Sequence, residues 1–212
     1  GTLRDWQWLF IIEAAPAALL GILVLFCLDN AIDEARWLSP AEKQLLKDRL
    51  AHDAGTKSDH SLRTLFSLPA IWLFVAILFC IVTGVYGINF WLPTIIGDTG
   101  LKSVLAIGAV TAACYFSAAM LSVLVTRHAE KVNEKRWHAA GAAVIGGVSL
   151  ALSATWTDNT LLTAVLLCLA TTGGLVATAL FWSFPGSMLK GAGVAAGLAA
   201  INSCGNLGGF VG

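Results

Sequence analysis

Residues 84–93, GVYGINFWLP, form the second half of an uncharged run that extends from residue 68 to residue 96. A helix of ~20 residues already crosses a hydrocarbon layer of ~30 Å, because each residue adds ~1.5 Å. The run is therefore predicted to span a membrane. Tyr86 and Asn89 lie inside it, three residues apart and so on one helical face. A polar face at membrane depth is by default a functional-site hypothesis, most simply a path for a solute that cannot cross lipid.

The composition of the 212 residues indicates an integral membrane protein. Hydrophobic residues make up 57% and charged residues 12%, whereas charged residues make up ~25% of an ordinary soluble domain. Lys plus Arg and Asp plus Glu balance at 13 each, so no basic excess indicates a nucleic-acid partner. Each of the five cysteines lies in a different apolar run without CxxC spacing, which favours small packing residues over disulfides or metal ligands.

Six runs are predicted to be transmembrane helices, which makes the chain an all-α, polytopic transmembrane helical bundle. They are 8–28, 68–96, 103–126, 139–156, 160–189 and 191–212. The fifth run contains Gly173, Gly174 and Pro185, which predict a bend or break near its end. The sixth run is rich in small residues, and two pairs of them predict close helix contacts: Gly193 with Gly197, and Gly205 with Gly209.

One long hydrophilic segment, residues 29–67, separates the first run from the others. Within it Ser39 fits an N-cap, Pro40 the first helical position and Glu42 the third residue after the cap, which is the pattern of a capping box. An apolar stripe follows, made of Leu45, Leu46 and Leu50. The segment is therefore predicted to be a linker that holds a short amphipathic surface helix, ending near residue 50 and followed by a flexible stretch.

The distribution of Lys and Arg predicts the orientation of the chain. Placing loops 29–67 and 127–138 and Lys190 on one side collects all 13 of these residues except Arg4 and Lys102. Cytoplasmic loops carry the excess of Lys and Arg, so this side is predicted to be cytoplasmic. The expected localisation is a multi-pass protein of the plasma membrane, which is the inner membrane in a bacterium.

Clusters of polar residues at membrane depth are the candidates for solute binding. Asn202 and Asn206 lie four residues apart and share a helical face, and their amides suit a carboxylate or a hydroxyl group. The alternative is that such residues only hydrogen-bond adjacent helices. Glu13, in the first run, is either a proton carrier or a structural hydrogen-bonding group. The remaining clusters are Tyr86 with Asn89, and Thr171, Thr178 and Ser183.

Nothing in the chain is typical of an enzyme or of a metal site. No HExxH, GxSxG or Walker pattern occurs, and no span gathers His, Cys, Asp and Glu. An ion channel is also disfavoured, since the spans have neither a charged ring nor a filter sequence of backbone carbonyls.

Five stretches, in order over nearly the whole chain, resemble one family. They are WQWLFIIEAAPAALLG (6–21), LSPAEKQLL (38–46), YGINFWLPTII (86–96), RHAEKVNEKRWH (127–138) and AAGLAAINSCGNLGGFVG (195–212). They resemble the anion:cation symporter family of the major facilitator superfamily, which includes permeases for phthalate, tartrate, hexuronates and sugar acids. The resemblance implies that 1–28 is helix 6 of twelve, 29–67 the central cytoplasmic linker and 68–212 helices 7 to 11 of the C-terminal bundle. Helices 1 to 5 and 12 would then belong to a longer polypeptide.

The resemblance also implies which residues face the solute. Helices 7, 10 and 11 help to line the central cavity in this family, so five residues are expected there: Tyr86, Asn89, Ser183, Asn202 and Asn206. Residues 127–138 are similar to the superfamily's loop between helices 8 and 9. Thr126 and Asn133 replace its two glycines and Glu130 its aspartate, which questions whether the tight turn is kept.

The function implied by this resemblance is secondary active transport, the proton-coupled uptake of an organic anion by alternating access. The anion would be a sugar acid, a dicarboxylate or an aromatic carboxylate. No cofactor is expected, because the proton gradient supplies the energy, and the expected partners are the anion, protons and the lipid bilayer, with the protein a monomer. No charged residue lies deep in the last five runs, so the charge partner and the proton site are expected in the N-terminal bundle. The rival hypothesis is a transporter-derived membrane scaffold or solute receptor that does not transport.

Overall fold

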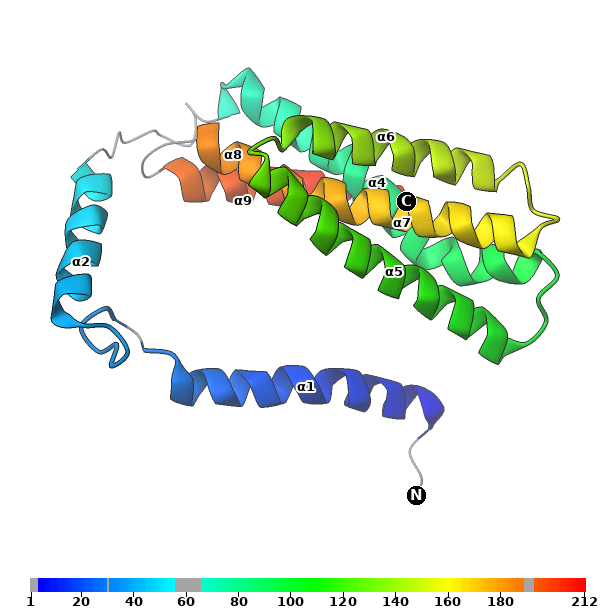
Figure 1. Ribbon diagram of the computed structural model, residues 1–212, viewed down its shortest axis with the longest axis horizontal. Helices are drawn as coiled ribbons and strands as arrows, with labels where there is room; N and C mark the ends of the chain where they lie inside the picture. The colour runs from blue at the N-terminus through cyan, green and yellow to red at the C-terminus, as the bar shows by residue number, and fades with distance from the viewer. Residues whose placement is uncertain (1–3, 30, 56–65, 189–192) are drawn as a thin grey trace. The chain divides into compact units, whose positions relative to one another are not determined.

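The computed structural model of the protein describes residues 4–29, 31–55, 66–188 and 193–212 (Figure 1). All the secondary structure in these ranges is helical, which confirms the all-α prediction. The chain divides into two units, Gly1–Gly55 and Thr56–Gly212.

The first unit holds two helices, α1 (Asp5–Cys27) and α2 (Pro40–Gly55). The predicted capping box at the start of α2 is present. The Ser39 N–H donates to Glu42 Oε2 at 2.9 Å, and the Glu42 N–H donates to the Ser39 hydroxyl oxygen at 3.4 Å. The Ser39 hydroxyl also donates to Glu42 Oε2 at 2.7 Å, and the two bonds that the carboxylate accepts lower the pKa of Glu42. The helix runs on to Gly55 rather than ending near residue 50, because Ala51 and Ala54 favour helix and Gly disfavours it. The rest of the predicted flexible stretch, 56–61, lies outside the described residues.

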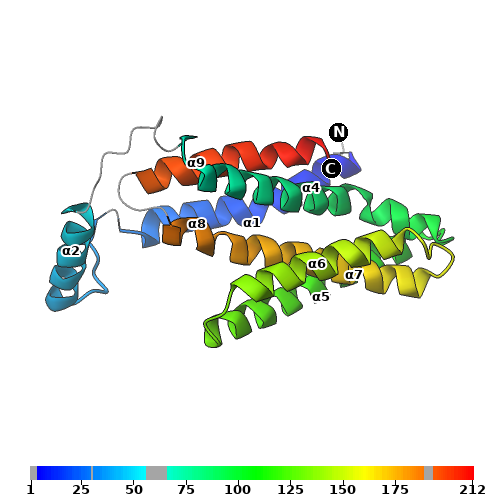
Figure 2. The ribbon, with the colours of Figure 1, turned by 90° about the horizontal axis from the view of Figure 1, so that it is seen from above.

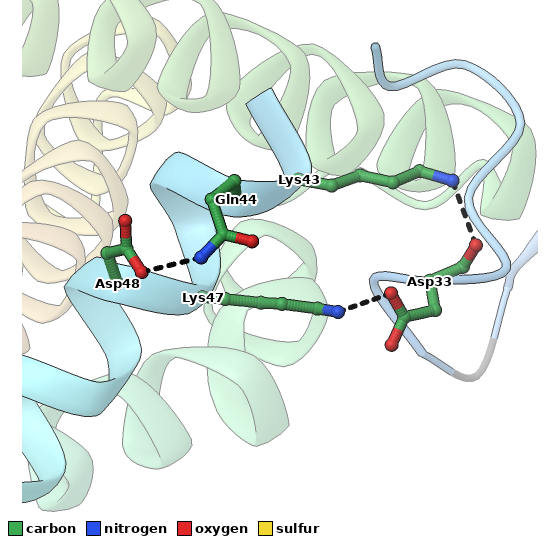
Figure 3. Close-up of polar contacts among 5 residues, drawn as sticks. All are labelled: Asp33, Lys43, Gln44, Lys47 and Asp48. Carbon is green, nitrogen blue, oxygen red and sulfur yellow. Dashed lines mark hydrogen bonds and ion pairs between the residues drawn. The ribbon is translucent and has the colours of Figure 1, made fainter. Parts of the chain in front are cut away.

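Asp33, in the turn before α2, interacts with two lysines of that helix (Figure 3). Lys43 Nζ donates to the Asp33 backbone carbonyl at 2.8 Å, and Lys47 Nζ pairs with the Asp33 carboxylate. The hydrogen bond and charge of Lys47 lower the pKa of Asp33. Because these groups are exposed, we expect them to set the path of the linker rather than to add much stability.

The second unit is a bundle of helices. Its elements are α4 (Pro69–Asp98), α5 (Val104–Lys131), α6 (Arg136–Ser153), α7 (Thr160–Phe181), α8 (Ser183–Met188), α9 (Gly193–Gly205) and the 3-10 helix η1 (Asn206–Phe210). α7 packs against α4, α5 and α6, and α4 also packs against α9 and η1. α4 therefore lies between α7 and the α9–η1 segment (Figure 2).

Four helical segments of the described residues are long and apolar enough to cross a membrane: α1, α4, α5 and α7 together with α8. The sequence predicts six. α6 has 18 residues, and α9 and η1 have 13 and 5, so these segments are shorter than the other four. The six-span topology remains a prediction for these two.

The break predicted near the end of the fifth run is confirmed, because α7 ends at Phe181 and α8 begins at Ser183. Pro185 has no N–H to donate to the Phe181 carbonyl, and its ring crowds that turn. α7 continues through Gly173 and Gly174 without a break. Lys190, which follows, lies outside the described residues.

Glycines allow the closest helix contacts in the second unit. A Cβ on Gly173 would lie 2.6 Å from Gly146 Cα, so α6 and α7 meet backbone to backbone. In the last segment, a Cβ on Gly205 would lie 2.6 Å from Leu78, whereas one on Gly209 would be 3.4 Å from the Tyr86 ring. The predicted close approach is present, but Gly208 meets the backbone of α4 more tightly than Gly209 does.

The connection between α5 and α6 is shorter than predicted, since most of 127–138 is helical and only 132–135 lie between the helices. Asn133 has a φ of 51°, the left-handed conformation that Gly adopts most easily and Asn tolerates. The tight turn is therefore kept although Asn replaces Gly. His138 closes it from α6, with Nδ1 2.9 Å from Glu134 Oε2 and Nε2 3.0 Å from His128 Nδ1.

Candidate functional site

Tyr86 lies on α4 at its border with η1. Tyr86 is 40% exposed on the second unit. Its ring lies against Gly209, where an added Cβ would be 3.4 Å from the ring. The ring of Phe90, one turn further along α4, is 6.1 Å away between centroids. The phenol is therefore held beside η1 while one side of it stays open.

Asn89 lies on the same helix, but its side chain forms a hydrogen bond with α5. Its Oδ1 accepts a hydrogen bond of 2.6 Å from the Tyr115 hydroxyl. The amide nitrogen has no partner among the described residues, so its N–H groups are available to a ligand. Asn89 is exposed and Tyr115 is half-buried.

Tyr115 is a residue that the sequence reasoning missed. The chain has only two tyrosines, and both lie in uncharged runs. A tyrosine at membrane depth needs a partner for its hydroxyl group. Searching the runs for every group that needs a partner, rather than for amides, would have found it.

Asn202 and Asn206 lie on one exposed helical face, as the spacing predicts. Asn206 Nδ2 donates to the Asn202 backbone carbonyl at 2.7 Å and to Asn202 Oδ1 at 2.8 Å. The amides thus bond within one turn rather than to an adjacent helix. Gly209, three residues after Asn206, meets the Tyr86 ring, whereas Gly205 packs against Leu78, so Asn202 lies closer than Asn206 to the start of α4. We call the five residues together the polar face: Tyr86, Asn89, Tyr115, Asn202 and Asn206.

Ser183 does not join the polar face. Its hydroxyl donates to the Leu180 carbonyl in its own turn at 2.7 Å, and the nearby Phe181 ring packs against Phe74 at 5.9 Å between centroids. Tyr86 lies about three turns further along α4 than Phe74, or roughly 18 Å. Two threonines of the same predicted cluster, Thr171 and Thr178, also donate to carbonyls of their own helix.

Every side chain of the polar face is neutral, so the face can recognise a ligand by hydrogen bonds but not by an ion pair. Within the described ranges no group of three or more His, Cys, Asp or Glu could hold a metal ion. Two hollows of the unit lie between α4, α6 and α7, and none of their lining residues belongs to the polar face. Four of its residues, Tyr86, Asn89, Asn202 and Asn206, are exposed on this unit, and Tyr115 is half-buried.

The cysteines that the sequence assigns to packing are free thiols. Cys114 is buried where α4, α5 and α7 meet, which fits that assignment. Its sulfur also lies 2.7 Å from that of Cys168 on α7, a neighbour that the sequence does not reveal.

Comparison with known proteins gives one consistent result. A family model described as Major Facilitator Superfamily matches residues 1–212. A protein of Agrobacterium vitis named as a tartrate transporter is 38% identical over 99% of this chain and 48% of its own length. The quinolone resistance transporter of Acinetobacter baumannii is 34% identical over 99% of this chain and 49% of its own. The inner membrane transport protein RhmT of Escherichia coli is 32% identical over 97% of this chain and 48% of its own.

The chain thus spans about half the length of the curated relatives it matches. No solved structure matches it significantly.

Proposed function

Because the chain belongs to the major facilitator superfamily, we propose that it forms about half of a proton-coupled carrier for organic anions and supplies one wall of the solute path. Membership of this family confirms a membrane transport protein rather than an enzyme. The finer statements, on solute, coupling and orientation, are the proposal.

The observation that carries the proposal is a neutral polar face on an otherwise apolar bundle. Exposed amides and phenols cannot be left against lipid tails without a large cost, so they must face protein or water. On this unit the polar face is open. A second bundle set against it would enclose an aqueous cavity, and rocking of one bundle against the other would expose that cavity to each side in turn.

The amide N–H groups of the polar face that have no hydrogen-bond partner support an organic anion as the solute. The Asn89 and Asn202 amide nitrogens have no partner within the described ranges, and each presents N–H donors. A carboxylate is purely an acceptor, so such donors suit it. A relative named as a tartrate transporter is consistent with this class of solute.

Proton coupling requires a group that titrates near neutral pH, such as a carboxylate or an imidazole, and the polar face contains neither. We therefore assign the proton site and the cation that pairs with the anion to the other bundle. In the same proposal the protein is a monomer of the plasma membrane, the inner membrane in bacteria, with 29–67 and 127–138 on the cytoplasmic side.

Uptake by the complete protein tests the proposal. Proteoliposomes with an inward proton gradient are offered labelled tartrate, gluconate or phthalate. We expect at least one anion to accumulate and a protonophore to abolish the accumulation. A solute that raises the thermal midpoint of the protein but never accumulates would instead favour the receptor alternative.

A further inference from the structure

We infer that Glu134, His138 and His128 form a proton-binding site at the turn between α5 and α6, which takes up one proton with its hydrogen bonds intact and opens on taking up a second. The site lies at the end of α5, outside the polar face, so it makes the junction of α5 and α6 depend on pH rather than carrying the transported proton. It is independent of the proposed function, which does not use this turn to bind the solute.

The three side chains form one continuous chain of contacts across the turn. His138 Nδ1 lies 2.9 Å from Glu134 Oε2, and His138 Nε2 lies 3.0 Å from His128 Nδ1. Both nitrogens of His138 are therefore engaged, whereas His128 Nε2 has no partner within the described residues. His128 is exposed, and the side chains of Glu134 and His138 are 36% and 23% exposed. Water therefore reaches the outer ring more easily than the middle one.

The carboxylate fixes the tautomer of both rings. The Trp137 N–H, 2.9 Å from Glu134 Oε1, and then His138 lower the pKa of Glu134, so this group is ionised at neutral pH. An ionised carboxylate only accepts hydrogen bonds, so His138 carries its hydrogen on Nδ1 and donates it to Glu134. His138 Nε2 is then an acceptor, and His128 donates to it from Nδ1. The nitrogen left without a hydrogen is His128 Nε2.

A first proton fits this chain without breaking a bond. Bound at His128 Nε2, it makes that ring an imidazolium, which still donates its Nδ1 hydrogen to His138 and does so more strongly. The negative charge of Glu134, at the other end of the chain, favours the positive charge. Imidazole is the side-chain group suited to proton uptake near neutral pH.

A second proton cannot be added in the same way. With both rings protonated, every ring nitrogen carries a hydrogen, so two N–H groups would oppose each other across the 3.0 Å between His128 and His138. The two positive charges also repel each other. The bridge that joins α5 to α6 should therefore open on the second uptake.

The charged groups around the site do not replace Glu134. α7 packs against this end of α5, with Val176 and Leu180 beside Ala129, and neither α7 nor α8 contains Asp, Glu, His, Lys, Arg or Tyr. The other charged residues lie on the turn itself and form no ion pair within the described ranges: Arg127, Glu130, Lys131, Lys135 and Arg136. Most of these are basic and oppose proton uptake, so the Glu134 carboxylate is the group that favours it.

NMR of the complete protein in lipid bilayers, with nitrogen-labelled histidine, tests the site. The nitrogen shifts distinguish bare, hydrogen-bearing and doubly protonated rings, and the signals are assigned by their loss in His128→Ala and His138→Ala. We expect a coupling across the hydrogen bond between His128 and His138 at neutral pH. As the pH falls, the pair should take up its protons in two separate steps, with loss of the coupling at the second step. His128→Ala should leave a single step.

Two carboxylate variants separate the charge from the hydrogen bond. Glu134→Gln keeps an oxygen that can accept from His138 but removes the charge, so the first step should move to lower pH. Glu130→Gln is the matched control, because it removes the same charge from the same turn at a side chain that contacts neither ring within the described residues. It should move the first step less. The thermal midpoint of each purified variant shows whether it is folded.

The outcomes are separate from those of the uptake assay. Two rings that titrate in one step, with no coupling between them, would overturn the site. An equal displacement of the first step in Glu134→Gln and Glu130→Gln would overturn the role of Glu134. Loss of anion accumulation in a folded His128→Ala protein would contradict the separation of this site from the transported proton.

Discussion

Gly173→Ala tests how α6 and α7 pack. A Cβ at this position would lie 2.6 Å from Gly146 Cα and 2.8 Å from Gly146 N, with the Ala142 carbonyl oxygen closer still. Cβ atoms essentially never lie within 3.0 Å of a neighbour, so the Gly146 backbone alone must retreat by at least 0.4 Å. All three obstacles are backbone atoms of one helix, so no side-chain rotation can relieve them.

We expect this change to destabilise the bundle by about 1 to 3 kcal/mol, the usual cost of overpacking a close interface. This cost should appear in the free energy of unfolding, because van der Waals contact, rather than the hydrophobic effect, holds helices together in lipid. Gly147→Ala is the matched control, since a Cβ there has no atom within 4 Å. Both changes gain the same helix propensity, which cancels when the two variants are compared.

The assay is equilibrium unfolding of the complete protein in mixed micelles with a rising fraction of SDS, followed by circular dichroism. Gly173→Ala should unfold at a lower SDS fraction than Gly147→Ala, which should match the wild type. Equal stability of the two variants would refute the backbone contact between α6 and α7.

Two further predictions concern the loops. In a background without the native cysteines, a cysteine at Lys131 should react with an impermeant label only from the cytoplasmic side and one at Asp158 only from the other side; labelling of both from one side would contradict the six-span topology. The Trp137 N–H and then His138 lower the pKa of Glu134 below its ordinary 4.5. A lowered pKa adds stability above the ordinary value and loses it as the pH falls through the folded value. The protection factor of the Trp137 amide hydrogen, its exchange rate relative to that of an unstructured peptide at the same pH, should therefore fall as the pH drops below about 4.5, and Glu134→Gln should abolish this dependence on pH. A protection factor that falls in the same way in Glu134→Gln would exclude Glu134 as its cause.

The membrane helices follow from the sequence because their signals are local. The uncharged run that holds Tyr86 is a helix from Pro69 to Asp98, close to its predicted bounds, and the capping box at Ser39 forms as expected. Helix ends are less predictable, because a charged residue can continue a helix beyond the hydrocarbon. α5 therefore runs through Arg127 to Lys131, although the uncharged run ends at Thr126.

The candidate site depends on contacts that no single run contains. Spacing along a helix places Asn202 and Asn206 on one face, but it does not show that one amide bonds the other. The pairing of Asn89 with Tyr115 joins α4 to α5 and needs the relative rotation of both helices. Ser183 could not be excluded from sequence, because the break after Phe181 decides where it lies.

Solute affinity of Asn89→Ala, measured in a Tyr115→Phe background, tests most directly whether the polar face binds the solute. In that background the bond between α4 and α5 is already absent, so removing the amide reports on the solute alone. A hydrogen bond to a charged group contributes about 1.5 to 3 kcal/mol, so affinity for the transported anion should fall by a further one to two orders of magnitude. The thermal midpoint of the same sample should barely change. An unchanged affinity with a lowered midpoint would show that Asn89 only joins helices, and would contradict the account.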